Sequence, residues 1–185
     1  MKTSKIIFLN GVTSSGKTTI SKAIQEIAKE QFYYLSNDMF FPIEHQMLHD
    51  KYIEDTGDAA KDKYMAEAIV MMYRFAKIVA EQGINIIIDG MLEERSGFVK
   101  YYERTNYDIL LDIFTGFNIY MVEVYCPLEE CRQRNIVRGD RSENQSQNQH
   151  DIMNKKIKYD FFVDTSIASA IECAEKILKE VYHTE

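Results

Sequence analysis

The sequence predicts an α/β fold, a three-layer sandwich in which helices cover both faces of a five-stranded parallel sheet. Short runs of β-branched and aromatic residues alternate along the chain with longer stretches whose apolar residues recur at helical spacing. Because a strand–helix–strand unit returns each strand in the same direction, this alternation favours parallel pairing. The predicted strands are residues 5–9, 32–35, 84–88, 119–125 and 161–163.

The helices follow from apolar residues spaced three or four positions apart. This pattern predicts helices over residues 18–30, 58–82 and 128–137, and a mostly helical segment over 97–117. Gly83 is typical of the residue that follows a helix. A last helix is predicted to bury one stripe made of Ile167, Ile171, Ala174, Leu178 and Val181.

One polar stretch, residues 142–149, has no apolar periodicity, and we expect a mobile loop or a frayed helix there. The chain contains neither an internal repeat nor a Pro/Ser-rich linker. A single domain over residues 1–185 is therefore the prediction.

Composition and charge narrow the class of protein. The net charge of −7 argues against a protein that binds nucleic acid through its overall field. Three cysteines without a C-x-x-C pair argue against a disulfide framework and favour a reducing, cytoplasmic location. No run approaches the roughly 18 apolar residues of a membrane span. We expect a protein without nucleic-acid or membrane partners, either a monomer or a homodimer.

The most specific motif runs from Gly11 to Thr18 and matches G-x-x-x-x-G-K-[ST]. It follows an apolar run and opens an amphipathic helix, which is the setting of a phosphate-binding loop (P-loop). Glycine lets successive N–H groups face an anion, the lysine ammonium suits the β- and γ-phosphates, and the last hydroxyl suits Mg²⁺. The alternative is a Gly/Ser-rich turn that binds nothing. The predicted ATP–Mg²⁺ site comprises Gly11, Thr13, Ser14, Ser15, Gly16, Lys17, Thr18 and Thr19.

Two acids follow predicted strands at the edge where parallel sheets bind ligands. Asp38 comes after the strand 32–35, and Asp89 comes after the strand 84–88. A hydroxyl acceptor needs a carboxylate to orient it and take its proton, and Mg²⁺ needs an acid beside the P-loop hydroxyl. We assign Asp38 as the base and Asp89, with Thr18, to Mg²⁺, although the roles could be exchanged. The alternatives are a helix N-cap for Asp38 and a turn residue for Asp89.

Arginines gather in an otherwise acidic chain just before the polar stretch. Arg134, Arg138 and Arg141 follow helical spacing and could form a cationic face for the transferring phosphoryl group, with Arg134 on the nucleotide and the other two in catalysis. A lid over about residues 132–155 is the corresponding prediction. The alternative is a solvated helix face that is paired with Glu129, Glu130 and Glu143.

With these residues placed, the chain resembles the chloramphenicol phosphotransferase family of P-loop kinases. The resemblance covers most of the chain, and its order of motifs is more specific than the P-loop alone. It includes residues 7–11 leading into 14–18, Asp38, residues 86–89, 138–141, 159–160, 163–165, Ser169 and residues 171–174.

The resemblance implies a P-loop NTPase of nucleotide-kinase-like fold with a lid, and ATP-dependent phosphorylation of a small-molecule hydroxyl, as in chloramphenicol 3-O-phosphotransferase. It also implies that Asp38 is the base and that arginines of the 138–141 segment belong to the lid. The segment 39–63 departs from the family pattern and should determine the acceptor. Two competing functions are a nucleoside, nucleotide or adenylylsulfate kinase and a non-catalytic ATP-binding regulatory module.

Overall fold

The structure is a computed structural model that describes residues 4–40, 46–94, 97–139 and 142–183, with residues 46–62 and Gly97 described by their backbone alone. Its centre is a five-stranded parallel sheet in the order β2-β3-β1-β4-β5. The central strand β1 is buried at every position, as expected for a strand covered on both faces. The strands are β1 (Ile6–Asn10), β2 (Phe32–Ser36), β3 (Asn85–Gly90), β4 (Ile119–Tyr125) and β5 (Phe161–Asp164).

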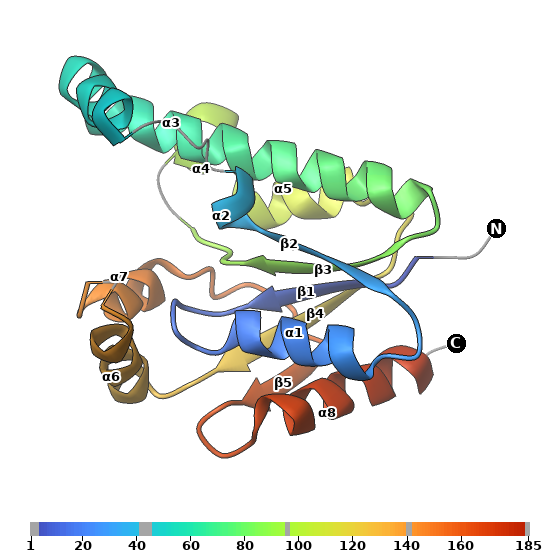
Figure 1. The fold of residues 1–185 in the computed structure, drawn as a ribbon. Helices are drawn as coiled ribbons and strands as arrows, with labels where there is room; N and C mark the ends of the chain where they lie inside the picture. The colour runs from blue at the N-terminus through green and yellow to red at the C-terminus, as the bar shows by residue number, and fades with distance from the viewer. Residues whose placement is uncertain (1–3, 41–45, 95–96, 140–141, 184–185) are drawn as a thin grey trace.

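Two helical layers cover this sheet, so the predicted three-layer arrangement is confirmed (Figure 1). One face packs against α3 (Gln46–Glu81), α4 (Gly97–Tyr102) and α5 (Asn106–Ile113), with Phe8 and Tyr73 in that core. The opposite face packs against α1 (Lys17–Ile27) and α8 (Ala170–His183). The remaining helices, α2 (Asn37–Phe40), α6 (Leu128–Arg138) and α7 (Gln145–Ile152), lie beyond the carboxyl ends of the strands.

Several helix boundaries differ from the sequence prediction. The helix predicted from residue 58 begins at Gln46 in α3, because adding turns to an existing helix costs little even where no apolar stripe marks them. The segment 97–117 forms two helices, separated by Glu103 in a left-handed conformation (φ 55°) and by a capping box on Thr105.

The polar stretch and the last helix need corrections as well. Of the two alternatives for residues 142–149, a mobile loop or a frayed helix, the structure shows a helix, because residues 145–149 belong to α7, which packs against α6. The last helix begins at Ala170, so Ile167 lies outside it and is 84% exposed. Ile171 is also largely exposed, and the buried stripe therefore starts at Cys173.

Asn10 is the last residue of β1, and its side chain connects two chain segments at the carboxyl edge of the sheet. It is fully buried, its Nδ2 donates to the Tyr159 hydroxyl, and its Oδ1 accepts from the Leu92 amide at 2.8 Å. The chain segments before β5 and after β3 are thereby held at the point where the Gly11–Thr18 loop begins.

We predict that Asn10→Ala lowers the free energy of unfolding by about 1–3 kcal/mol, because the partly buried Tyr159 hydroxyl and the buried Leu92 amide lose their partner. Urea denaturation followed by circular dichroism measures this loss. Asn118→Ala, at an exposed position, is the matched control and should change stability by less than about 0.5 kcal/mol. Equal stabilities of the two variants would contradict the anchoring role of Asn10.

Candidate functional site

The Gly11–Thr18 loop has the backbone geometry of an anion cradle. Gly16 caps α1 with φ 102°, a conformation that favours glycine, and no side chain caps the amides of the first turn. At Gly11 an added Cβ would lie 2.4 Å from the Val124 carbonyl oxygen, so only glycine fits there. Ser14 also has a positive φ, 59°. The helix N-terminus therefore presents uncapped N–H groups to a ligand.

Lys17, Thr18 and Asp89 form one polar cluster beside this loop. The Lys17 ammonium donates to the carbonyl oxygens of Gly11 and Val12 at 2.8 and 2.9 Å, and lies 3.8 Å from an oxygen of Asp89. The Thr18 hydroxyl donates to the other Asp89 oxygen at 2.8 Å. Asp89 is a strand residue of β3 that is 7% exposed, not the turn residue of the alternative interpretation.

Tyr34 on β2 completes the surroundings of Asp89, and sequence reasoning missed it. Its hydroxyl donates to Asp89 at 3.0 Å. Burial, and next the Asp89 charge, raise the pKa of Tyr34, so the phenol keeps its proton and remains a donor at neutral pH. Only strand pairing could have revealed this contact, because β2 and β3 become neighbours in the sheet with Ser36 opposite Asp89.

A cavity of about 1040 Å³ extends along the carboxyl edge of the sheet and contains most of the predicted site. One end is lined by the loop after β5, from Thr165 to Ala170, together with α6. The other end is lined by β2 and α2 and by the residues that follow Asp89. The lining includes Thr13, Ser14, Gly16, Lys17, Thr18, Thr19, Tyr34, Asn37, Asp38, Met39, Asp89, Arg134 and Arg138.

Asp38 lies at the second of these ends, in the first turn of the short helix α2. Asp38 is exposed, in contrast to the buried Asp89. It is the second residue of α2 rather than the residue that caps it. The adjacent Asn37 has a buried Oδ1 atom that finds no partner among the described residues, so this wall offers an unsatisfied acceptor.

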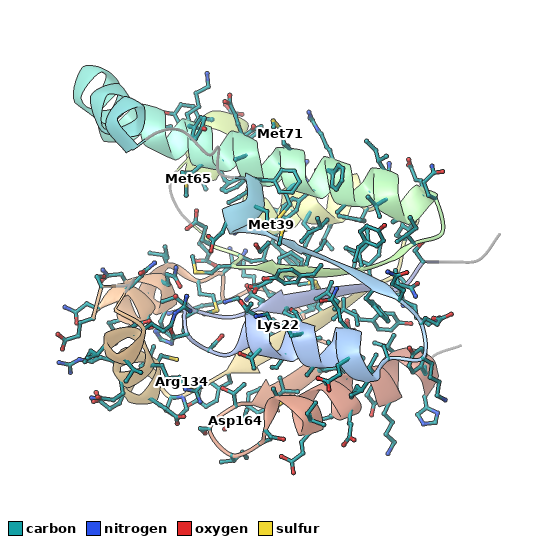
Figure 2. All side chains as sticks on the ribbon, in the orientation of Figure 1. Lys22, Met39, Met65, Met71, Arg134 and Asp164 are labelled. Atoms are coloured by element: carbon teal, nitrogen blue, oxygen red, sulfur yellow. The ribbon has the colours of Figure 1, made fainter. Side chains whose placement is uncertain are left out.

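Arg134 connects the P-loop to the loop after β5. Its guanidinium donates to the carbonyl and hydroxyl oxygens of Thr165 at 3.0 Å each and to the Ser14 carbonyl at 3.3 Å. It also pairs with Glu130 on its own helix. Figure 2 shows Arg134 on the side of α6 that approaches the loop beginning at Asp164.

The other arginines of this segment differ in their environment. Arg138, the last residue of α6, is exposed and lines the same cavity. Arg132 pairs with Glu129 and Glu143 at the surface, as the solvated-face alternative predicted for this helix. Arg141 lies outside the described residues.

Three polar residues of α6 and α7 hold the P-loop, and sequence reasoning missed all of them. The Asn135 side chain accepts from the Ser14 hydroxyl at 2.7 Å and donates to Ser146 at 2.8 Å. The Ser146 hydroxyl in turn donates to the Thr13 carbonyl, and the Thr13 amide donates to the Gln149 side chain. A polar segment without apolar periodicity carries no sequence signal for such contacts.

The donors present suit a nucleotide and Mg²⁺. A helix N-terminus without a side-chain cap, next to a lysine, is a common phosphate site. The Thr18 hydroxyl and the Asp89 carboxylate supply two hard oxygen ligands 2.8 Å apart. Among the described residues no group of three His, Cys, Asp or Glu side chains could hold a metal by itself. Mg²⁺ commonly uses only one or two carboxylates together with substrate phosphates.

Cysteine chemistry and a membrane span find no support in the described part of the chain. Cys126, Cys131 and Cys173 are buried and unpaired by disulfides. Burial raises the pKa of the Cys131 thiol to about 12, which disfavours the reactive thiolate.

Within the described ranges, every helix is too short or too polar to span a bilayer.

Comparisons with known proteins agree with this fold. Shikimate kinase from Acinetobacter baumannii, solved with shikimate, superposes with a TM-score of 0.63 at 18% identity, covering 100% of this chain and 96% of that one. The APS kinase CysC of Mycobacterium tuberculosis, in complex with AMPPNP and APS, superposes with a TM-score of 0.62 at 15% identity, covering 97% and 99%. The fold is that of the P-loop kinases.

The family follows from the sequence. The model of the family described as "Chloramphenicol phosphotransferase-like protein" matches residues 4–182. The chain therefore belongs to this family and is a kinase-type phosphotransferase. A relative in Mycobacterium tuberculosis H37Rv, named "Putative O-phosphotransferase Rv2636", is 26% identical over 193 residues. That alignment covers 96% of this chain and 82% of the relative.

We predict that Asn135→Ala loosens the P-loop, because the buried Ser146 hydroxyl and the Ser14 hydroxyl lose their shared partner. The free energy of unfolding should fall by about 1–3 kcal/mol, and hydrogen exchange of the 13–16 amides should accelerate. Gln133→Ala, exposed on the same helix, is the control and should leave that exchange unchanged. Slow exchange retained in Asn135→Ala would show that α6 does not hold the loop.

Proposed function

We propose that the protein transfers the γ-phosphoryl group of ATP, bound with Mg²⁺, to a hydroxyl of a small molecule. The observation that carries the proposal is the continuous cavity of about 1040 Å³, which joins the P-loop to the Asp38 wall. Such a cavity can hold donor and acceptor together at the same loop, and positioning supplies much of the catalysis in phosphoryl transfer.

The triphosphate would lie on the first-turn amides of α1, with the Lys17 ammonium on its β- and γ-phosphates. To reach them, this ammonium would exchange its carbonyl partners for phosphate oxygens. The nucleoside would extend toward the loop after β5, which closes the other end of the cavity. Arg134 would hold these two loops together, and Arg138 would add positive charge at the cavity wall.

The Thr18 hydroxyl and the Asp89 carboxylate would hold Mg²⁺, directly or through water. When bound, the ion would neutralise charge on the phosphates. Tyr34 would keep the Asp89 carboxylate oriented through its 3.0 Å hydrogen bond. Asp89 already interacts with Lys17, Thr18 and Tyr34, so its charge is directed toward the loop rather than toward an acceptor.

Asp38 would then be the base that orients the acceptor hydroxyl and takes its proton. Its exposed carboxylate lies on the cavity wall, at the end away from the loop after β5. Tyr34, Asn37 and Met39 give this wall both polar and apolar surface, which suits a hydroxylated organic acceptor.

The cations of the cavity bear on the competing kinase class. Among the described lining residues they are Lys17, Arg134 and Arg138. Lys17 and Arg134 contact the P-loop, and Arg138 is the third. A phosphorylated acceptor would need a basic pocket besides the P-loop. We propose an acceptor without a phosphate, with a nucleotide or adenylylsulfate as the competing acceptor.

Residues 132–155 would act as the lid. The Thr13 amide donates to Gln149 of α7, and a phosphate oxygen at that amide would replace this acceptor. Closure of α6 and α7 over ATP would therefore exchange protein hydrogen bonds for bonds to the nucleotide.

We predict that Lys17→Ala reduces phosphoryl transfer by about 100-fold or more, because a cation at the transferring group is lost. The measurement is ATP consumption over a panel of hydroxylated antibiotics and metabolites that includes chloramphenicol. Lys22→Ala, which alters an exposed lysine on the same helix (Figure 2), should retain full activity. ATP binding without consumption over the whole panel would favour the regulatory module instead.

We predict opposite defects for the two acids. Asp38→Asn should spare ATP binding but lower turnover by about 100-fold or more, because it removes a general base. Asp89→Asn should weaken Mg²⁺-dependent ATP binding, measured by calorimetry with and without Mg²⁺. Full turnover in Asp38→Asn together with lost turnover and intact ATP binding in Asp89→Asn would exchange the two roles.

A further inference from the structure

A second cavity of about 460 Å³ lies on the other side of the phosphate loop. Gly11 and Val12 form part of its wall, whereas Thr13, Ser14 and residues 16–20 line the first cavity. Its remaining walls come from the end of β4 and the turn after it, and from the end of α7 with the segment that follows. They include Glu123, Tyr125, Cys126, Leu128, Met153 and Tyr159.

Glu123 gives this cavity an acidic group that no residue of the described chain pairs with. It lies on β4 directly opposite Asn10 of β1, and it is partly buried. Among the described residues it has neither a hydrogen-bond nor an ion-pair partner. Burial alone raises the pKa of Glu123. A carboxylate that is partly removed from water without a partner is costly, and a bound cation would offset that cost.

The basic side chains at the cavity rim do not pair with Glu123. Lys155 and His150 also line the cavity, but both residues are exposed, and His150 lies 3.6 Å from Asp151. A nearby positive charge would lower the pKa of Glu123, yet no such contribution opposes the effect of burial. The charge of Glu123 instead helps to raise the pKa of Tyr159 to about 12, after burial as the main cause.

The rest of the wall suits the body of an organic cation rather than a bare metal ion. Val12, Leu128 and Met153 pack in one apolar cluster that borders the cavity. Tyr125 lines it as well, with its ring stacked on Phe162 at 5.8 Å and 43% of its surface exposed. Aromatic rings and thioethers attract cationic and apolar groups. No cluster of metal-ligating side chains occurs among the described residues.

We propose that this second cavity binds a small organic amine, with its ammonium on Glu123 and its apolar body against Val12, Leu128 and Met153. The site is separate from the ATP and acceptor sites proposed above, and its existence does not depend on them. Its occupant would touch Gly11 and Val12, whose carbonyl oxygens hold the Lys17 ammonium. Binding there is therefore expected to change nucleotide affinity, and nucleotide should change amine affinity by the same factor.

The test uses benzylamine, which is a cation at neutral pH, and neutral benzamide of similar shape. Calorimetry with the full chain should give saturable millimolar binding of benzylamine and at least about tenfold weaker binding of benzamide, because a charge-assisted hydrogen bond is lost. In protein with ¹³C-methyl methionine, the Met153 resonance should shift with the same affinity. Absence of saturable benzylamine binding would overturn the proposal.

Three variants locate the amine. Glu123→Gln keeps the shape of the side chain and should weaken benzylamine binding about tenfold, with folding verified by its melting temperature. Glu175→Gln, the same charge change at an exposed site on α8, should bind as the parent does. Asp38→Asn should also retain binding. Loss in Asp38→Asn, with binding intact in Glu123→Gln, would place the amine on the acceptor wall and overturn the proposal.

Discussion

The structure of the site depends on how the buried Asp89 carboxylate is compensated. A carboxylate that is 7% exposed must be paired and hydrogen-bonded, and here Lys17, Thr18 and Tyr34 supply those interactions. Lys17 and Thr18 belong to the first turn of α1 and Tyr34 belongs to β2, so one acid on β3 joins three elements at the edge of the sheet. The Thr18 hydroxyl and the Asp89 carboxylate are the groups proposed to hold Mg²⁺, so the groups that a nucleotide would engage also hold the site together.

A second set of polar contacts ties the P-loop to α6 and α7. Asn135, Ser146 and Gln149 interact with Ser14 and Thr13, and Arg134 joins the same loop to Thr165. A phosphate oxygen could replace the acceptor of the Ser14 hydroxyl or of the Thr13 amide, whereas an apolar interface could not respond to an anion in that way. The helices that we propose as the lid are thus coupled to the loop that would bind ATP.

The P-loop also separates the two cavities. Its first residues, Gly11 and Val12, line the Glu123 cavity, and Thr13, Ser14 and residues 16–18 line the larger one. The carbonyl oxygens of Gly11 and Val12 hold the Lys17 ammonium, and Lys17 lines the larger cavity. This contact is a direct physical route by which an occupant of one cavity could affect the other.

Sequence alone determined the features that depend on local patterns. The alternation of short apolar runs with helical stretches predicted the parallel sheet, and the spacing of Gly11, Gly16, Lys17 and Thr18 predicted the loop. Both signals are local, because strand burial and backbone turning are encoded over a few neighbouring residues. Only the tertiary structure decided which distant side chains meet there. No local pattern marks Tyr34, Asn135, Gln149 or Glu123, because strand order and helix packing create their environments. Tyr34 contacts Asp89 across 55 positions of the chain, and Gln149 contacts Thr13 across 136 positions. The helix made from the polar residues 145–152 has the same origin, because its packing on α6 and its bonds to the P-loop replace the apolar stripe that sequence analysis looks for.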